Sequence, residues 1–310
     1  MSDEASPSPP VSFEHGDAVG PVILGLGGTL LVLAMVMYIA REPERAWPEY
    51  FAHRAKAKRR ETMQMLFQRT VAEFIGTFFV VVTIELTAGQ SRAPLAPLAI
   101  GSALMAMTFA FGHVSGAHFN PAITLSVFVR GKIEPIPAFA YLAAQLIGAF
   151  GGAAVELITV GDSCINAPLG DPGRCGAGFP FKSFLYHDDP GVPFLTEFLY
   201  TFMLCTVYLN VASSRAQEHN SFFGLAVGFA LMVGAVAAGD ISGGCFNPAV
   251  GTALPAIHGN HQSIWLYWIP PCLGAALASV IFRFVTSLSD DYIDSQQEIM
   301  EISARQLSAR

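Results

Sequence analysis

Two copies of the tripeptide Asn-Pro-Ala are the part of this sequence best suited to a specific chemistry. They are Asn120-Pro121-Ala122 and Asn247-Pro248-Ala249, and each is preceded by Ser-Gly-x-x-Phe. Asparagine is a preferred N-cap, and proline is favoured at the first position of a helix, where no N–H donor is needed. We therefore expect short helices at residues 121–130 and about 248–256, both too short to cross a bilayer.

Two such helices that meet end to end inside a membrane would form a pore for polar, neutral molecules. Each helix N-terminus carries about half a positive charge, and each asparagine amide can offer an N–H donor while its oxygen caps the helix. The carbonyls of the preceding loops, residues 113–119 and 240–246, would add hydrogen-bond acceptors. A cation or a proton would meet two positive helix ends. Two unrelated Asn-Pro turns are the alternative, but they leave the repeated Ser-Gly-x-x-Phe unexplained.

The composition indicates which elements must hold these motifs. Hydrophobic residues make up 52% of the 310 residues and charged residues only 13%, with a mean hydropathy of +0.46, whereas soluble domains carry about 25% charged residues. Apolar runs near the ~20 residues that cross a bilayer recur along the chain. They predict an all-α membrane protein. The expected spans are residues 20–40, 70–89, 95–112, 136–160, 193–212, 222–239 and 264–286.

The last six of these spans form an internal repeat. Glu73 opens one span with Glu-Phe-Ile-Gly-Thr-Phe, and Glu197 opens another with Glu-Phe-Leu-Tyr-Thr-Phe. The glutamates are 124 positions apart and the motif asparagines 127. A unit of three spans is thus duplicated, and because three is odd, the second copy enters the membrane from the opposite side. Such inverted repeats place their functional site near the midplane, between the halves.

Glu73 and Glu197 would be buried in membrane spans, which is costly and needs a reason. Non-helical backbone at membrane depth must be hydrogen-bonded by protein groups. We therefore expect each carboxylate to accept hydrogen bonds from the backbone of one loop. A proton relay is the alternative, but the two glutamates occupy equivalent places and no Lys or Arg falls beside them in the spans.

The distribution of Lys and Arg predicts the orientation of the chain, whose net charge is −7. With residues 41–64 in the cytoplasm, 14 of the 17 Lys and Arg lie on that side, as the positive-inside rule requires. The C-terminus is then cytoplasmic as well, and the N-terminus is on the opposite side. We expect an integral multi-pass protein of the plasma membrane or of an endomembrane.

The remaining segments complete the expected domain organisation. It consists of a disordered tail at 1–19, an extra membrane helix at 20–40, a basic cytoplasmic linker at 41–64, a channel domain at 65–288 with repeat halves of about 65–160 and 190–288, and a C-terminal tail at 289–310. Cys164 and Cys175 fall in the long non-cytoplasmic loop, where a disulfide and two unpaired thiols are both compatible with the sequence. No Cys or His cluster indicates a metal. We expect no cofactor and no nucleic-acid partner.

These motifs resemble those of the aquaporin, or major intrinsic protein, family over about residues 65–286, and the match is closest from Gly112 to Thr124. The resemblance implies a right-handed bundle of six membrane helices with two re-entrant half-helices. It also implies a homotetramer with four independent pores, and passive conduction of water or small uncharged solutes. The pore-loop positions that it indicates are His113, Gly116, His118, Gly243 and Cys245.

The second motif departs from the family pattern at the selectivity constriction. The four positions of this ring hold Ile100, Ala235, Gly244 and Val250. Val250 stands where most members have an arginine, so we expect a wider, uncharged ring that admits glycerol, urea, ammonia or hydrogen peroxide. Such an apolar ring could instead lose its water and conduct poorly.

Two neighbouring features bear on the same question. The pair Tyr267-Trp268 resembles members of the water type rather than the glycerol type, in conflict with the wide ring. Pro255 is expected to shorten the second short helix. Cys245, two residues before Asn247, is expected to lie near the lumen and to be a target for mercurials.

Two other functions are compatible with parts of the sequence. A non-conducting junction or scaffold protein would use the extra span and the basic linker, but nothing in adhesion requires two asparagines that face a lumen. A coupled transporter would need a relay at the midplane, for which only Glu73 and Glu197 qualify. An enzyme is not expected, because no nucleophile–base pair or metal set falls beside the spans.

Overall fold

The computed structural model describes residues 63–88, 93–160, 190–257 and 261–286, and within them every regular element is helical. Short 3-10 helices occupy Ala93–Leu95, Arg215–Gln217 and His261–Tyr267. The described residues therefore confirm the all-α fold class. The α-helices are α3 (Met63–Ala88), α4 (Ala96–Ser115), α5 (Pro121–Val129), α6 (Pro135–Val160), α8 (Gly191–Ser213), α9 (Phe223–Ser242), α10 (Val250–Ile257) and α11 (Ile269–Val285).

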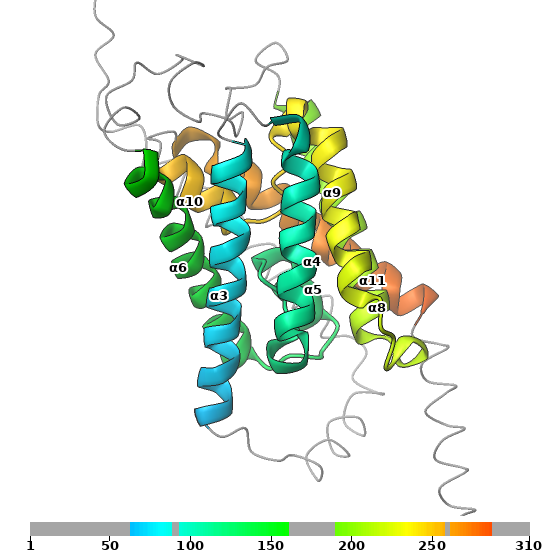
Figure 1. The fold of residues 1–310 in the computed structure, drawn as a ribbon. Coiled ribbons are helices and arrows are strands. Elements are labelled where there is room, and N and C mark those ends of the chain that lie inside the picture. Colours follow the sequence, from blue (N-terminus) through cyan, green and yellow to red (C-terminus); the bar gives the residue numbers. More distant parts are fainter. Residues whose placement is uncertain (1–62, 89–92, 161–189, 258–260, 287–310) are drawn as a thin grey trace, which may run out of the picture.

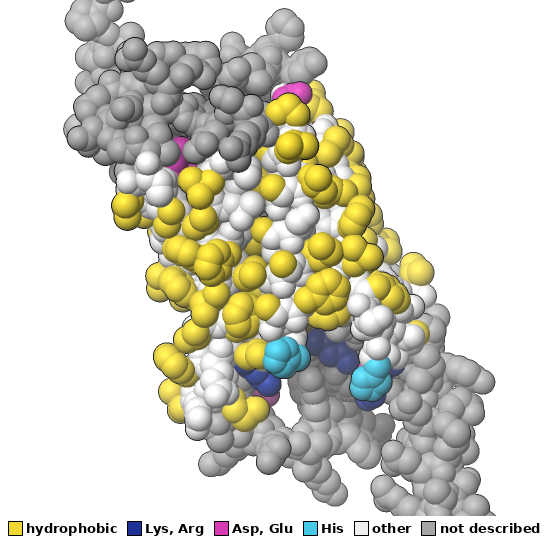
Figure 2. All heavy atoms as spheres, in the orientation of Figure 1, with side chains coloured by type: hydrophobic (Ala, Val, Ile, Leu, Met, Phe, Trp, Pro, Cys, Tyr) yellow, Lys and Arg dark blue, Asp and Glu magenta, His cyan; other side chains and the backbone are white. Residues whose placement is uncertain are grey.

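Six segments of the described chain are long and apolar enough to cross a membrane, which confirms the six spans predicted for the repeat. Helices α3, α4, α6, α8 and α9 supply five, and the sixth runs over Ser263–Val285. In Figure 2, hydrophobic side chains cover most of the visible face, and Lys, Arg and His side chains gather at its lower end. Because such an apolar surface is stable only against lipid, the chain is an integral multi-pass membrane protein.

Four spans differ from their predicted bounds. Helices α4 and α9 each extend three residues further than predicted, to Ser115 and Ser242. Helix α3 begins at Met63 rather than at residue 70. The sixth span is not one α-helix, since the 3-10 turn His261–Tyr267 precedes α11. Pro270 and Pro271 lie in the first turn of α11. Proline has no N–H to donate to a preceding turn, so a helix can begin with these residues but cannot continue regularly through them.

Several predictions lie outside the described residues and stay predictions. They are the N-terminal tail at 1–19, the extra membrane helix at 20–40, nearly all of the linker at 41–64, the C-terminal tail at 289–310, and the pair Cys164 and Cys175.

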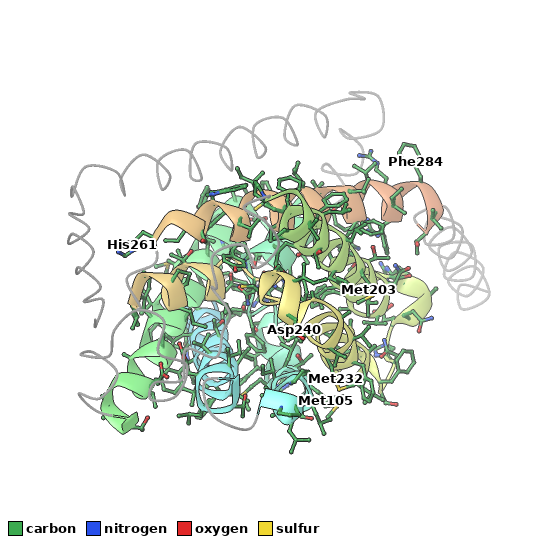
Figure 3. The ribbon with its side chains drawn as sticks, turned by 90° about the horizontal axis from the view of Figure 1, so that it is seen from above. Met105, Met203, Met232, Asp240, His261 and Phe284 are labelled. Atoms are coloured by element: carbon green, nitrogen blue, oxygen red, sulfur yellow. The ribbon has the colours of Figure 1, made fainter. Side chains whose placement is uncertain are left out.

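The two halves of the repeat meet where α4 crosses α9. A Cβ atom at Gly101 would lie 2.7 Å from the carbonyl oxygen of Gly228, and one at Gly228 would lie 2.5 Å from that of Gly101. Met105 and Met232 flank this crossing (Figure 3). Small residues let membrane helices approach closely, so this pair of glycines sets the distance between the halves.

The two short helices lie in opposite parts of the bundle, α10 in its upper part and α5 lower down (Figure 1). Helix α5 has 9 residues and α10 has 8. Helix α10 begins at Val250, two residues later than predicted, because Pro248 and Ala249 form a turn. Pro255 lies inside α10 and does not end it; the helix continues to Ile257, about as far as the sequence predicts.

Candidate functional site

Each asparagine motif caps the short helix that follows it. Asn120 has an extended backbone, and its side-chain oxygen accepts a hydrogen bond of 2.8 Å from the N–H of Ala122. The side-chain oxygen of Asn247 accepts a bond of 3.0 Å from the N–H of Ala249. The cap satisfies one of the N–H groups that a helix start leaves without an intrahelical partner.

The side-chain nitrogens of the same asparagines connect the two halves. Asn120 Nδ2 donates to the carbonyl oxygen of Phe246 at 2.8 Å, and Asn247 Nδ2 donates to that of Phe119 at 3.0 Å. Each asparagine thus bonds the residue just before the other one. An amide nitrogen carries two hydrogens, so each side chain retains a second N–H beyond this bond, where the segments that precede α5 and α10 contact each other.

Two buried glutamates hold the irregular segments before the motifs, which we call the first loop (residues 116–120) and the second loop (residues 243–249). Glu73 accepts hydrogen bonds from the backbone N–H groups of His118 at 2.9 Å and Phe119 at 2.7 Å. Glu197 accepts the equivalent bonds from Cys245 at 2.9 Å and Phe246 at 2.7 Å. Charge-assisted bonds of this kind offset the cost of burying a carboxylate.

A serine completes each carboxylate site. Ser115 Oγ donates to Glu73 at 2.7 Å, and Ser242 Oγ donates to Glu197 at the same distance. These bonds account for both buried glutamates by loop anchoring, without any movement of a proton.

The backbone of both loops adopts left-handed conformations. Gly116 and Gly243 both have φ of 92°, and Phe119 and Phe246 both have φ of 50°. Non-glycine residues rarely adopt positive φ, and their presence in both loops indicates that the surrounding hydrogen bonds impose the loop shape.

Two tyrosines at equivalent positions hold the serine carbonyls. Tyr141 Oη donates to the carbonyl oxygen of Ser115 at 2.8 Å, and Tyr267 Oη donates to that of Ser242 at 2.7 Å. Sequence reasoning missed this role. The signal was present, because each tyrosine lies at nearly the same separation from its serine, 26 and 25 positions.

Several further polar contacts surround the first loop. Gln145 Nε2 donates to Glu73 at 2.8 Å and to Thr124 Oγ1 at 2.9 Å. His118 Nδ1 lies 3.1 Å from the same Thr124 oxygen. Tyr208 Oη donates to the carbonyl oxygen of Gly116 at 2.6 Å. None of Gln145, Thr124 and Tyr208 was singled out from the sequence.

The predicted loop residues differ in their location and in their exposure. His118, Gly243 and Cys245 are buried in the two loops, and Gly116 is partly exposed. His113 was expected in the first loop, but it lies in the last turn of α4 with its side chain exposed. Its repeat counterpart, exposed Asp240 near the end of α9, lies closer to the middle of the bundle than His261 does (Figure 3).

The loop carbonyls available to a passing molecule are therefore fewer than expected. Residues 113–115 and 240–242 are helical. The carbonyls of Gly116 and Phe119 each have one of their two lone pairs occupied, by hydrogen bonds from Tyr208 and Asn247. Within the described chain, the carbonyls of Ala117 and His118 are the ones in the first loop before Phe119 that have no protein donor.

The four residues of the expected constriction are apolar, and two of them are in direct proximity. A Cβ atom on Gly244 would lie 3.1 Å from Cα of Ala235. Ile100 and Val250 are 6% and 1% exposed, and Val250 is the first residue of α10. No group of three or more His, Cys, Asp or Glu side chains that could bind a metal occurs among the described residues.

Comparison with known proteins identifies relatives over most of the chain. The family model for the major intrinsic protein matches residues 59–282. The chain is 31% identical to Aquaporin NIP1-4 of Oryza sativa subsp. japonica, over 72% of this chain and 78% of that protein. It is 32% identical to Glycerol uptake facilitator protein-like 6 of Lactiplantibacillus plantarum, over 71% of this chain and 99% of that protein.

A solved structure shows the same fold. The aquaglyceroporin from Plasmodium falciparum aligns with a TM-score of 0.54 at 19% identity, over 71% of this chain and 96% of that one.

Proposed function

Since the chain belongs to the major intrinsic protein family of channels for water and small solutes, we propose that it conducts water and small uncharged solutes through a pore where α5 and α10 meet. The observation that carries this proposal is the reciprocal bonding of the asparagines. Asn120 and Asn247 each cap a half-helix and bond to the opposite loop. The second N–H of each amide would serve as a donor to the permeating molecule.

Exclusion of protons and cations follows from the same arrangement. Two helix N-termini bring partial positive charge to one point, and the two asparagine donors orient a water molecule through its oxygen. A water held in this way cannot accept and pass on a proton along the file, and a cation gains no acceptor there.

The solutes that we propose are those admitted by an apolar ring of Ile100, Ala235, Gly244 and Val250, namely glycerol, urea, ammonia or hydrogen peroxide besides water. The conflicting pair Tyr267 and Trp268 has a structural role that weakens its value as a signal for water specificity. Tyr267 holds the carbonyl of Ser242, and Trp268 Nε1 donates to Thr252 Oγ1 of α10 at 2.8 Å.

Assembly and orientation are part of the proposal. We expect a homotetramer in which each subunit has its own pore, with the channel domain at residues 65–288. The linker at 41–64 and the C-terminus would face the cytoplasm, and the N-terminus the opposite side, in the plasma membrane or an endomembrane. The Lys, Arg and His side chains at one end of the visible surface support this orientation (Figure 2).

The test is stopped-flow light scattering on proteoliposomes that contain the full chain. The vesicles are challenged in turn with an impermeant osmolyte, glycerol and urea, and empty vesicles serve as the control. Fast water flux with solute flux supports the proposal as stated. Water flux alone would reject the wide ring. The absence of any flux would reject conduction and favour a scaffold protein of the same fold.

A further inference from the structure

The first loop, unlike the second, is open to solvent at one residue. Gly116 is partly exposed, whereas residues 117–121 are all buried. In the second half, residues 242–250 are all buried. The groups that surround Gly116 are therefore the ones that a solute could meet first as it reaches the loop from this side.

Three residues converge at this opening. Tyr208 Oη donates to the carbonyl oxygen of Gly116 at 2.6 Å. A Cβ atom on Gly116 would lie 3.3 Å from His118 Nε2 and 3.4 Å from Tyr208 Oη. The rings of His118 and Tyr208 meet edge to face, with centroids 5.6 Å apart and an interplanar angle of 84°. The tyrosine hydroxyl and the imidazole nitrogen thus border the same small space.

The hydrogen bonds around Thr124 determine which imidazole nitrogen carries the proton. Thr124 Oγ1 has one hydrogen, which it donates to the carbonyl oxygen of Asn120 at 3.1 Å. The same oxygen accepts from Gln145 Nε2 at 2.9 Å. All its contacts are hydrogen bonds only if His118 Nδ1, 3.1 Å away, is also a donor. The ring then carries its proton on Nδ1, and Nε2 is an acceptor.

The space beside Gly116 therefore presents acceptors rather than donors. Tyr208 has used its only hydrogen on Gly116, so its oxygen retains lone pairs alone. His118 Nε2 is a second acceptor, and the Gly116 carbonyl, which has two lone pairs, is a third. Three acceptors without a donor favour a molecule with several N–H or O–H hydrogens, and each acceptor left unmatched would lose binding energy.

We propose that Gly116, His118 and Tyr208 form a solute-selection site in the first half of the pore, and that it favours small neutral amides and amines, such as urea and ammonia, over polyols. This inference rests on the proposed channel function. Urea has four N–H donors and one acceptor, so it can bond two of the acceptors at once. Each hydroxyl of a polyol brings one donor together with lone pairs that have no partner here.

The repeat shows that this site is an addition to one half rather than a requirement of the fold. The counterpart of Tyr208 in α3, by the spacing of the two glutamates, is Ile84. Isoleucine cannot donate to a loop carbonyl. The second loop keeps its shape with bonds to Glu197, Ser242, Tyr267 and Asn120 and without a counterpart of Tyr208, so such a tyrosine is not needed to hold a loop of this kind.

The test compares urea and glycerol permeability in proteoliposomes for the wild type and for Tyr208→Ile, which installs the counterpart residue. We expect the urea-to-glycerol ratio to fall about fivefold, the effect of about one neutral hydrogen bond. Tyr208→Phe keeps the ring and removes the same hydroxyl, so we expect a fall of similar size, about fivefold. Tyr200→Ile is the matched control on the same helix, because Tyr200 packs on Phe246 of the second loop rather than on the first loop. Its urea-to-glycerol ratio should equal that of the wild type.

The outcomes separate this inference from the function on which it rests. An unchanged ratio in both Tyr208 variants, with water flux intact, overturns the selection site and leaves the channel standing. A wild type that conducts nothing overturns both. Equal falls in the Tyr208 and Tyr200 variants would show a general loosening of the bundle and would also overturn the site. Melting temperatures of the purified variants confirm that each is folded.

Discussion

The two loops share a polar framework but differ in what packs around it. In both, a glutamate, a serine, a tyrosine and an asparagine make matching bonds within 0.2 Å of each other. The phenylalanine before each asparagine packs against different residues in the two loops. Phe119 lies directly over Gly76, where a Cβ atom would overlap its ring. The counterpart of Gly76 is Tyr200, and its ring packs on Phe246 at 5.6 Å.

This difference indicates that the bonds to the loops are constrained while their packing is free to diverge. In the second half, Phe246 finds its space at Gly234, where a Cβ atom would lie 2.6 Å from the ring. Ala117 and Gly244 likewise occupy equivalent left-handed positions, at φ of 55° and 62°. Different packing residues therefore support the same loop conformation in the two halves.

Removal of a glutamate should have the largest effect on stability. A comparison of the two variants should reveal which half depends more on its glutamate. Glu73→Ala and Glu197→Ala each leave two buried backbone donors unsatisfied, so we expect a loss of about 3 kcal/mol in the free energy of unfolding. Glu73 also accepts from Gln145, so its loss should be the greater. Thermal unfolding in detergent measures both. Equal destabilisation would show that Gln145 contributes nothing to the first half.

A conservative change of the same residue addresses the proton relay. Glu73→Gln removes the ionisable group and keeps one acceptor oxygen. We expect solute flux that is independent of any pH gradient to remain. If flux in the wild type follows a pH gradient and the variant loses that dependence, the relay is correct and loop anchoring is not the whole role.

A side chain at Gly76, over which Phe119 packs, should cause the next largest loss of stability. In Gly76→Ala the new methyl group overlaps the Phe119 ring, and overpacking of this kind costs about 2 kcal/mol. The matched change Gly234→Ala crowds Phe246 less closely and should cost less. Melting temperatures of the two variants give the comparison. A more severe effect at Gly234 would mean that the second loop is the more tightly packed one.

Val250→Arg tests whether the second half controls the size of the solute. The substitution places a long cation at the start of α10, where the expected constriction lies. We expect glycerol and urea permeability to fall about tenfold, as for ~1.4 kcal/mol of added barrier, and water permeability to fall less. Val250→Leu is the uncharged control. If both variants conduct solutes like the wild type, the constriction is elsewhere.

Substitution of Cys245 should have the smallest effect on flux, and its thiol is a chemical marker for the second loop. Its sulfur donates to the carbonyl oxygen of Asn247 at 3.1 Å, and serine can make a similar bond. Cys245→Ser should therefore keep its flux but lose inhibition by mercurials. Cys272→Ser, in α11, is the control and should remain sensitive. A Cys245→Ser channel that is inhibited as fully as the wild type would contradict the position assigned to this thiol.

The elements of this fold could be predicted because their signals are local. Long apolar runs mark the six spans, and the Asn-Pro sequence marks the start of each short helix, at Pro121 itself for α5 and two residues before Val250 for α10. The bonds of Glu73 to a loop also follow from the sequence alone, because a buried carboxylate and an irregular backbone in one membrane must satisfy each other.

The contacts that distinguish the halves could not be predicted, because they join distant residues. Tyr208 and Gly116 are 92 positions apart, and no pattern in α8 distinguishes a tyrosine that reaches a loop from one that faces lipid. The sequence predicts His113 in the loop because the apolar span is expected to end at Gly112. Helix α4 instead continues to Ser115 and ends at Gly116, its left-handed cap. The 3-10 turn before α11 contacts α10, and Pro270 and Pro271 at the start of α11 are the local signal for this break in the helix.

The crossed bonds of the two asparagines have a consequence for biosynthesis. Asn120 bonds to Phe246, 126 positions later, and Asn247 to Phe119, 128 positions earlier. When the first half leaves the ribosome, its own loop can already bind Glu73, but the amide of Asn120 has no acceptor until the last third of the chain is made. Contacts of such long sequence separation form late. The inserted first half therefore lacks these bonds until Phe246 and Asn247 have been synthesised. A chain truncated before Phe246 could not form them and would present an unfinished membrane protein to the quality-control machinery of the cell.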